Sequence, residues 1–208
     1  MTQKFLLCLF CLMSLLTGVA MATEEPSYTS VLQEAAFEIR EYPALIAAEV
    51  TVQGDRSEAV SAGFRLLAGY IFGGNTRKQS IAMTAPVIQN EASSEKIAMT
   101  APVIQSPDPE GWIIRFIMPA SYTLETLPTP NDPKVRLVRL PPKRFAVVRF
   151  SGLVDDKDVE EQTAALRAFV SKQQLTAVGT PSLARYDPPW TLWFLRRNEI
   201  MLELSPKK

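Results

Sequence analysis

Histidine is absent from this 208-residue sequence, and cysteine occurs only twice. Both cysteines, Cys8 and Cys11, lie in an apolar run close to the N-terminus. Without histidine a chain cannot form a Ser-His-Asp triad, a Cys-His pair or an ordinary His/Cys zinc site. Catalysis would have to depend on carboxylates, lysine, tyrosine or hydroxyl groups. The composition therefore disfavours an ordinary hydrolase, and we expect a protein that is not an enzyme.

The sequence also lacks an excess of charge of either sign, because 22 Lys and Arg residues balance 22 Asp and Glu residues. Nucleic-acid-binding proteins usually carry clustered positive charge, so we expect no nucleic acid partner. The charge balance is compatible with binding of a neutral or amphipathic small ligand. The length and the hydrophobic content of 47% suit one domain with a buried core. Nothing in the composition indicates an oligomeric state.

Residues 1–22 have the three parts of an export signal. Lys4 precedes an uncharged apolar run, and Ala20-Met21-Ala22 matches a small-x-small cleavage site. The run is short for a membrane-spanning helix, which needs about 20 apolar residues. We therefore expect cleavage after Ala22, export to the periplasm or the extracellular space, and no stable membrane span in the mature chain.

The remainder of the chain is predicted to be α+β, with two similar halves. We expect an N-terminal extension at 23–35 and a single domain at 36–208, with pseudo-repeats at about 36–119 and 134–204. Each half follows the order strand, strand, helix, strand, strand. Two such units would form a mostly antiparallel distorted barrel with two packed helices. The predicted strands are 36–42, 45–52, 81–88, 97–104, 111–119, 134–140, 144–152 and 199–204, and the predicted helices are 55–72 and 155–174.

One phrase of nine residues, IAMTAPVIQ, occurs at 81–89 and again at 97–105. Its Met, Thr, Val and Ile residues favour strands, and the NEASSEK between the copies is polar and loop-like. We expect the copies to form two arms of a hairpin, with Pro86 and Pro102 at strand ends or edge positions.

Several phrases together resemble the SOUL heme-binding protein family: FGGN, the doubled KIAMTAPV-type phrase, FIMPASYTLETLPTPNDP, RFAVVRFSG and ARYDPPW followed by RRNE. The resemblance covers about 36–204 and keeps the family's order of motifs. It implies two pseudosymmetric units in a distorted barrel, an architecture shared with bacterial effector-binding domains of the GyrI-like kind. It also implies binding of heme or another tetrapyrrole. Because folds host many functions, the fold follows from the resemblance more firmly than the ligand does.

The helix predicted at 55–72 is apolar on more than one side. Only one charged residue, Arg65, lies between 59 and 72. A helix that is apolar all round must be covered on both sides, so we expect a loop, a partner or a ligand beside Arg65, Leu66 and Tyr70. The residues expected to pack on the sheet are Val60, Phe64, Leu67 and Ile71.

The segment YDPPWTLWFLRRNE at 186–199 is the predicted second wall of this site. Aromatic faces supply stacking area and guanidinium groups bind carboxylates, so the segment suits a flat macrocycle with two carboxylate arms. The alternative is that the aromatics are core and that the arginines are solvated or pair with Glu199. The resemblance places the ligand between the first helix and this segment. The predicted ligand-binding residues are Arg65, Leu66, Tyr70, Tyr186, Trp190, Trp193, Phe194, Arg196 and Arg197, and none is predicted to be catalytic.

No residue is predicted to be an obligatory metal ligand. The usual imidazole ligand of heme iron is missing, and each methionine or tyrosine is better explained as core. The expected cofactor is therefore heme or a metal-free porphyrin held by its apolar surface. The carboxylate pairs Asp155-Asp156 and Glu160-Glu161 are interpreted as helix-start residues, where negative charge is favourable. Other functions left open are binding of another amphipathic small molecule, hydrolysis on the GyrI-like fold, and binding of a partner protein.

Overall fold

The described chain consists of nine strands and two α-helices in one antiparallel arrangement. The computed structural model describes residues 23–91, 111–188 and 190–206. The helices are α2 (Arg56–Ile71) and α3 (Asp156–Lys172), and a single 3₁₀ turn, η1, spans Trp193–Leu195. The strands are β1 (Thr29–Glu34), β2 (Phe37–Tyr42), β3 (Leu45–Val52), β4 (Val87–Glu91), β5 (Trp112–Ile117), β6 (Arg136–Leu140), β7 (Lys143–Ser151), β8 (Ala177–Arg185) and β9 (Arg197–Leu204).

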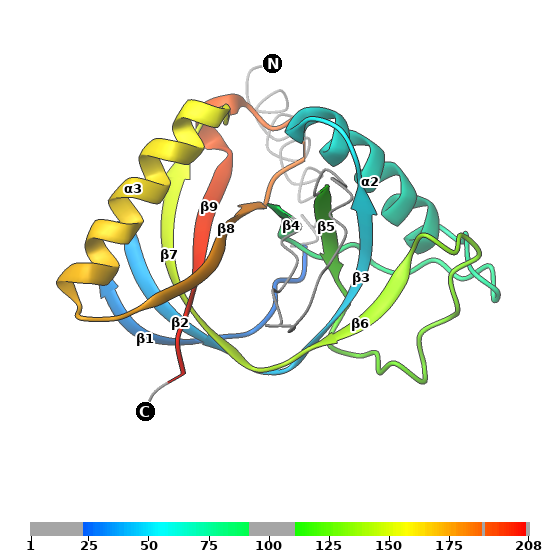
Figure 1. The fold of residues 1–208 in the computed structure, drawn as a ribbon. Helices are drawn as coiled ribbons and strands as arrows, with labels where there is room; N and C mark the ends of the chain where they lie inside the picture. The colour runs from blue at the N-terminus through cyan, green and yellow to red at the C-terminus, as the bar shows by residue number, and fades with distance from the viewer. Residues whose placement is uncertain (1–22, 92–110, 189, 207–208) are drawn as a thin grey trace, which may run out of the picture.

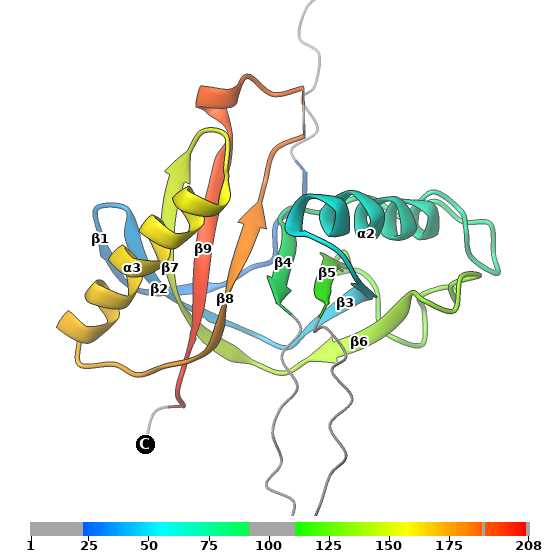
Figure 2. The ribbon, with the colours of Figure 1, turned by 45° about the horizontal axis from the view of Figure 1, so that its top comes forward.

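All nine strands belong to one sheet, in the order β1-β2-β7-β9-β8-β4-β5-β3-β6. Both helices lie against the same face, with α3 over the β7-β9-β8 half and α2 over the β3-β5 half (Figure 1). The α+β prediction with duplicated units is confirmed. Within the described residues the sheet ends at β1 and β6 and is not closed. It is an open, strongly curved sheet, which corrects the expectation of a barrel (Figure 2).

The two halves of the chain exchange their first strands. The order strand, strand, helix, strand, strand holds for β2-β3-α2-β4-β5 and again for β6-β7-α3-β8-β9. However, β2 pairs with β7 of the second half, and β6 pairs with β3 of the first half. At the centre β4 pairs with β8, where Ile88 lies opposite Ala184. The sheet is therefore a pseudo-two-fold assembly of the two halves.

Helix α2 begins after Asp55, whose side chain accepts a hydrogen bond from the Glu58 N–H at 2.8 Å. Leu67 and Ile71 are buried as predicted, and Phe64 packs edge to face on Phe116 of β5, with ring centroids 5.3 Å apart. Val60 and Phe64 are nevertheless only half-buried. The small residues of α2 allow the helix to approach the sheet closely on their own side. The fully buried residues of α2 are Ala59, Gly63, Leu67, Tyr70 and Ile71.

Helix α3 begins at Asp155, which forms a reciprocal capping box with Asp158. Each carboxylate accepts from the other residue's backbone N–H, at 2.8 and 3.0 Å. The bond from the Asp158 N–H holds the pKa of Asp155 below its ordinary value. The acidic start of α3 thus caps the helix.

The first copy of the repeated phrase is only partly a strand. Strand β4 begins at Val87, whereas 81–88 was predicted as strand throughout. Before it, the Ile81 N–H donates to the Ile71 carbonyl at 2.7 Å, and the Thr84 hydroxyl donates to the Ile117 carbonyl. These contacts tie the phrase to the end of α2 and to β5. The second copy, predicted as a strand at 97–104, lies outside the described residues.

The remaining predicted strands are present with small shifts of their ends. Two observed strands, β1 and β8, were not predicted. Strand β8 contains Gly179 and Pro181, and its pairing with β9 shifts register between Val178 and Ser182. Such irregularity hides the alternating pattern by which a strand is usually found.

Candidate functional site

The connection between β8 and β9, residues 186–196, exposes an unusual amount of apolar surface. We call it the β8–β9 loop. Figure 2 shows it projecting beyond the ends of β8 and β9. Large exposed apolar groups that lie together on a protein surface commonly mark a site of interaction. The exposed side chains and their exposed fractions are Trp190 82%, Leu192 59%, Trp193 59%, Phe194 53% and Leu195 61%.

Local hydrogen bonds fix the shape of the β8–β9 loop. The Thr191 N–H donates to the Pro188 carbonyl at 3.0 Å, and the Leu195 N–H donates to the Leu192 carbonyl at 2.9 Å. The Arg196 Nε donates to the Thr191 carbonyl at 2.9 Å. With its backbone turned on itself, the loop directs its apolar side chains outward. Trp193 and Phe194 pack edge to face, with ring centroids 5.6 Å apart.

Arg197, predicted to bind a ligand carboxylate, already has carboxylate partners within the protein. It is the first residue of β9, and its guanidinium contacts Glu199 at 2.8 Å and Glu25 at 3.0 Å. It also lies over the Tyr186 ring, 3.7 Å from the ring centroid. Tyr186 and Arg197 therefore belong to a polar network on the face of the sheet opposite the helices.

Glu199 is the centre of that network and is fully buried. Arg40 contacts both of its carboxylate oxygens, at 2.7 and 3.1 Å, and the Tyr186 hydroxyl donates to it at 2.7 Å. Burial alone would raise the pKa of Glu199, but the bonds and charge of Arg40, with the bonds from Tyr186 and Arg197, hold it below its ordinary value. Glu199 is therefore a charged structural group with little capacity to act as a base.

The predicted residues of α2 lie apart from the β8–β9 loop. Arg65 is exposed, and Leu66 is half-buried against the core under α2. Tyr70 is 2% exposed, and its hydroxyl donates to the Pro128 carbonyl at 2.9 Å. Burial raises the pKa of Tyr70 to about 12. Across the ranges that the structure describes, no hydrogen bond, ion pair or ring contact joins these three residues to the β8–β9 loop.

A group of positive charges near the β8–β9 loop escaped the sequence analysis. Arg185 is the last residue of β8, and Arg56 is the first residue of α2. Burial lowers the pKa of Arg185, and the positive charges of Arg56 and Arg196 lower it further. The sequence could have indicated the position of Arg185. It follows the apolar Leu183 at the two-residue spacing that puts both side chains on one face of a strand.

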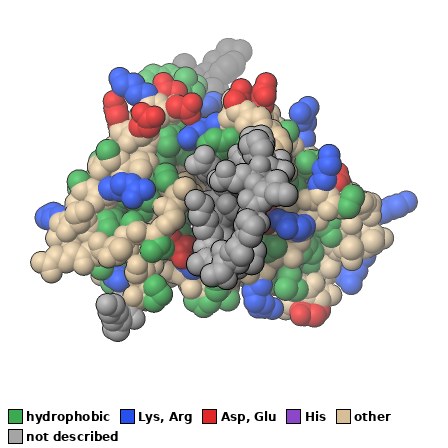
Figure 3. Space-filling model, viewed as in Figure 1, with side chains coloured by type: hydrophobic (Ala, Val, Ile, Leu, Met, Phe, Trp, Pro, Cys, Tyr) green, Lys and Arg blue, Asp and Glu red, His purple; other side chains and the backbone are tan. Residues whose placement is uncertain are grey.

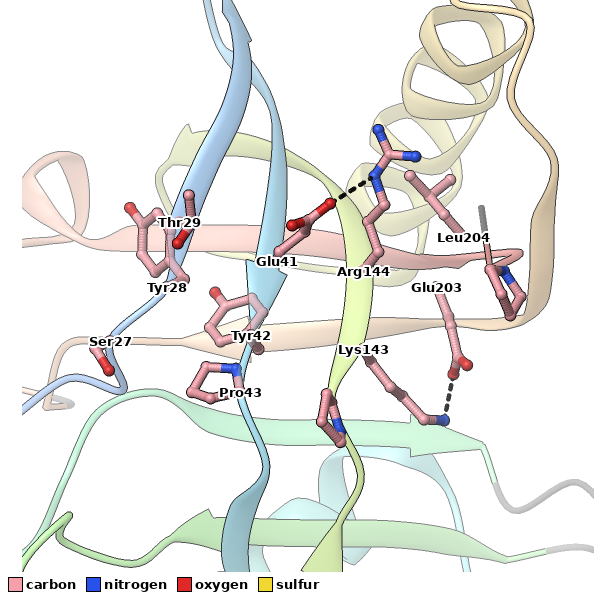
Figure 4. A pocket seen from close by; sticks show the side chains of 12 residues that line it. Ser27, Tyr28, Thr29, Glu41, Tyr42, Pro43, Lys143, Arg144, Glu203 and Leu204 are labelled. Atoms are coloured by element: carbon pink, nitrogen blue, oxygen red, sulfur yellow. Dashed lines mark hydrogen bonds and ion pairs between the residues drawn. The ribbon is translucent and has the colours of Figure 1, made fainter. Parts of the chain in front are cut away.

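Two cavities lie elsewhere on the second half of the sheet. The larger, about 660 Å³, lies at the far ends of β7 and β9 from the β8–β9 loop, and its charges are paired (Figure 4). There Lys143 contacts Glu203 at 2.5 Å, and Arg144 lies 3.7 Å from Glu41. The second, about 550 Å³, is lined by Arg40, Arg149, Arg197 and others on the polar face. None of the predicted ligand-binding residues except Arg197 lines either cavity.

Within 23–91, 111–188 and 190–206, no three His, Cys, Asp or Glu side chains are grouped as metal ligands. Over the same residues, no helix combines the length and apolar character needed to cross a membrane.

Comparison with known families identifies the chain. The sequence profile of the SOUL heme-binding protein matches residues 23–93 and 88–203. The chain belongs to the SOUL heme-binding protein family. The two matched segments together span most of the sequence, which confirms the family resemblance carried by the motifs. Among curated individual proteins, none matches this SOUL protein.

Solved structures share the fold of this SOUL protein at low sequence identity. The EcmrR C-terminal domain has a TM-score of 0.57 at 12% identity, over 86% of this chain and 98% of that one. A hydrolase from Listeria innocua has a TM-score of 0.54 at 15% identity, over 84% and 94% of the two chains. EcmrR in a complex with DNA has a TM-score of 0.58 at 11% identity, over 81% and 57%. These similarities show that the fold is shared and show nothing about ligands.

Proposed function

We propose that this SOUL protein is an exported, non-enzymatic binder of heme or metal-free porphyrin, and that the β8–β9 loop is its binding surface. One observation carries the proposal. A member of a heme-binding family presents five large apolar side chains, each more than half exposed, on one short loop. A flat apolar macrocycle would cover this surface. The alternative ligand is another amphipathic small molecule with a flat apolar face.

Each part of the loop has a defined role in this proposal. Trp190, Trp193 and Phe194 supply rings that stack on the macrocycle. Arg196, at the end of η1, supplies positive charge beside them. Arg197 contributes less than expected from the sequence, because Glu199 and Glu25 already occupy its guanidinium.

The residues of the loop fit the macrocycle but offer no strong ligand to iron. Residues 187–196 include no His, Cys, Met or Tyr, which are the usual protein ligands of heme iron. The neighbouring Tyr186 hydroxyl donates to Glu199. The proposal therefore assigns binding to the porphyrin faces and carboxylates. Heme would supply the same faces and carboxylates as a metal-free porphyrin.

A hydrolytic function has less support. The most deeply buried carboxylate, Glu199, accepts bonds from two arginines and a tyrosine, and its pKa lies below its ordinary value. A general base in a hydrolase needs a carboxylate free to take a proton near neutral pH. We therefore retain small-molecule binding without catalysis.

Equilibrium titration tests the proposal. Purified residues 23–208 would be titrated with hemin and with metal-free protoporphyrin IX, with binding followed by absorbance. We expect both to bind, with affinities within about tenfold of each other, which corresponds to about 1.4 kcal/mol. A larger preference for hemin would reveal an iron ligand that the proposal does not contain. Failure of both to bind would reject tetrapyrrole binding.

A further inference from the structure

Arg185 is a half-buried arginine that pairs with no carboxylate among the described residues. It lies directly opposite Val87 on β4 and Asn198 on β9. Directly opposed residues of paired strands point to the same face, and Val87 packs in the core under α2. Arg185 therefore points to the face that carries the helices. Within the described parts of the chain it forms no hydrogen bond and no ion pair.

Two neighbouring groups on this face also have unused bonding capacity. Gln89, two residues beyond Val87 on β4, is 3% exposed. Its Nε2 donates to the Arg56 carbonyl at 3.2 Å, whereas its Oε1 has no hydrogen-bond partner. The Arg56 Nε lies 2.8 Å from Asp156 but makes no well-directed hydrogen bond. The Gln89 Oε1 atom can only accept a hydrogen bond, so a carboxylate would not bond to it. The N–H donors available to a carboxylate on this face are those of Arg185 and Arg56.

Two other arginines lie near Arg185, because Arg56 and Arg196 both act on its charge. Arg56 is 26% exposed and lies over the Trp112 ring, 4.8 Å from its centroid. Its partner Asp156 is 76% exposed, at the start of α3. Figure 3 shows that the acidic side chains at the starts of both helices lie at the outer surface. A group of like positive charges at a half-buried position attracts an anionic ligand.

We propose that Arg185, beside the Asp156-paired Arg56, forms an oxyanion subsite that binds one carboxylate of the tetrapyrrole. The inference rests on the proposed function and assigns the carboxylate to Arg185, whereas the sequence pointed to Arg196 and Arg197. Arg185 precedes Trp190 by five positions at the base of the β8–β9 loop. A macrocycle stacked on the loop can thus place one arm on the guanidinium. Because a guanidinium presents several N–H donors in one plane, it suits a carboxylate.

A charge-matched pair of porphyrins tests this subsite. The variant Arg185→Gln and the wild type would be titrated with metal-free protoporphyrin IX and with its dimethyl ester, which has no carboxylates. We expect the variant to bind the acid about tenfold to hundredfold more weakly, the loss typical of a charge-assisted bond. Its affinity for the ester should stay within about twofold of wild type. The control is Arg167→Gln on the exposed side of α3, which should bind both porphyrins as wild type does.

A second measurement separates a ligand role from a structural one. Without ligand, Arg185→Gln should melt at the same temperature as wild type or higher, because the variant loses a positive charge that Arg56 and Arg196 repel. A lower melting temperature, with equal losses for acid and ester, would show that Arg185 acts on the fold and would overturn the subsite. Acid binding as tight as wild type would also overturn it. If wild type binds neither porphyrin, the proposed function itself fails and the subsite fails with it.

Discussion

Glu199 and the groups bonded to it determine the polar interior on the face opposite the helices. The carboxylate is fully buried and contacts Arg40, Arg197 and Tyr186. Because all three are hydrogen-bond donors, the buried charge is compensated within the protein. Removing one member of such a group leaves another buried charge without its partner. This destabilises the fold more than replacing the whole group by apolar residues would.

We predict that Glu199→Gln lowers the free energy of unfolding at neutral pH by up to about 3–5 kcal/mol, because Arg40 then keeps only Glu38 and Arg197 only Glu25 as a counter-charge. Chemical denaturation would measure the change. The matched control is Glu203→Gln on the same strand, whose pair with Lys143 is partly exposed and should contribute less than about 1 kcal/mol. Equal effects of the two substitutions would show that the Glu199 network contributes no more than a surface pair.

The lowered pKa of Glu199 also predicts a dependence on acid. A carboxyl group with a lower pKa in the folded protein than in the unfolded one stabilises the fold above its unfolded pKa. That stabilisation is lost as the pH falls from the ordinary value of 4.5 through the lower folded value. Denaturation across this range should show a steeper loss of stability for wild type than for Glu199→Gln. Parallel pH profiles would contradict the assignment.

Among the elements, α2 depends on one glycine for its position. A Cβ atom built on Gly63 would lie 2.5 Å from the Ile114 Cγ1 atom, well inside van der Waals contact. Gly69, on the exposed side of the same helix, would meet no atom within 4 Å. The two glycines therefore differ in packing while sharing the same helix.

We predict opposite effects for alanine at these two positions. Gly63→Ala should destabilise the protein by about 1–3 kcal/mol, because the helix or the Ile114 side chain must move. Gly69→Ala should stabilise it by about 0.5–1 kcal/mol through helix propensity alone. Thermal melts of the two variants beside wild type would measure both changes. A stabilising Gly63→Ala would mean that α2 does not approach β5 as closely as described.

The elements predicted correctly are those with clear local signals. Strand β2 follows from the alternation of apolar and polar residues, and the start of α2 follows from the capping residues Asp55 and Ser57 that precede its apolar part. Strand β8 did not follow, because its Gly179, Pro181 and register shift hide the alternation. The pairing of β2 with β7 also had no local signal, since it joins residues far apart in the chain.

The candidate site was predictable only where its residues carry a local signal in the sequence. The aromatic residues of the β8–β9 loop were found from composition alone. The ion pair of Arg197 with Glu199 depends on which strands are neighbours. So does the position of Arg185, which forms no ion pair within the described residues. Tyr70 was placed beside the ligand because the helix face was assigned from large apolar residues, whereas Ala59 and Gly63 face the sheet.

At the scale of the whole molecule, two buried glutamates join the halves of the chain. Arg40 of the first half contacts Glu199 of the second, and Arg136 of the second contacts Glu49 of the first at 2.8 Å. Both glutamates are almost completely buried. The exchanged strands β2 and β6 carry the arginines. Each exchanged strand thus brings an arginine to a buried glutamate of the other half, and Glu49 also pairs with Arg115 of its own half.

Export is a prediction about the whole chain. The Lys4, apolar run and Ala20-Met21-Ala22 pattern should lead to cleavage after Ala22. Mass spectrometry of the protein from the periplasmic or extracellular fraction should therefore give an N-terminus at Thr23. An intact Met1 on protein recovered from the cytoplasm would contradict export.

The central claim is that the β8–β9 loop is the tetrapyrrole-binding surface. The sequence has three tryptophans, Trp112 and the two on the loop. In the variant Trp112→Phe, all tryptophan fluorescence would therefore come from Trp190 and Trp193. Titrating this variant with metal-free protoporphyrin IX tests the claim most directly.

We expect protoporphyrin to quench most of that fluorescence, with a midpoint that matches binding followed by absorbance. Replacing Trp190 and Trp193 by Ala in the wild-type background should weaken binding by about 1–3 kcal/mol, because stacking area is lost from an exposed loop. Melting temperature should hardly change, since both side chains are more than half exposed. Binding by absorbance without quenching, and without loss of affinity in the double variant, would place the tetrapyrrole elsewhere on the molecule.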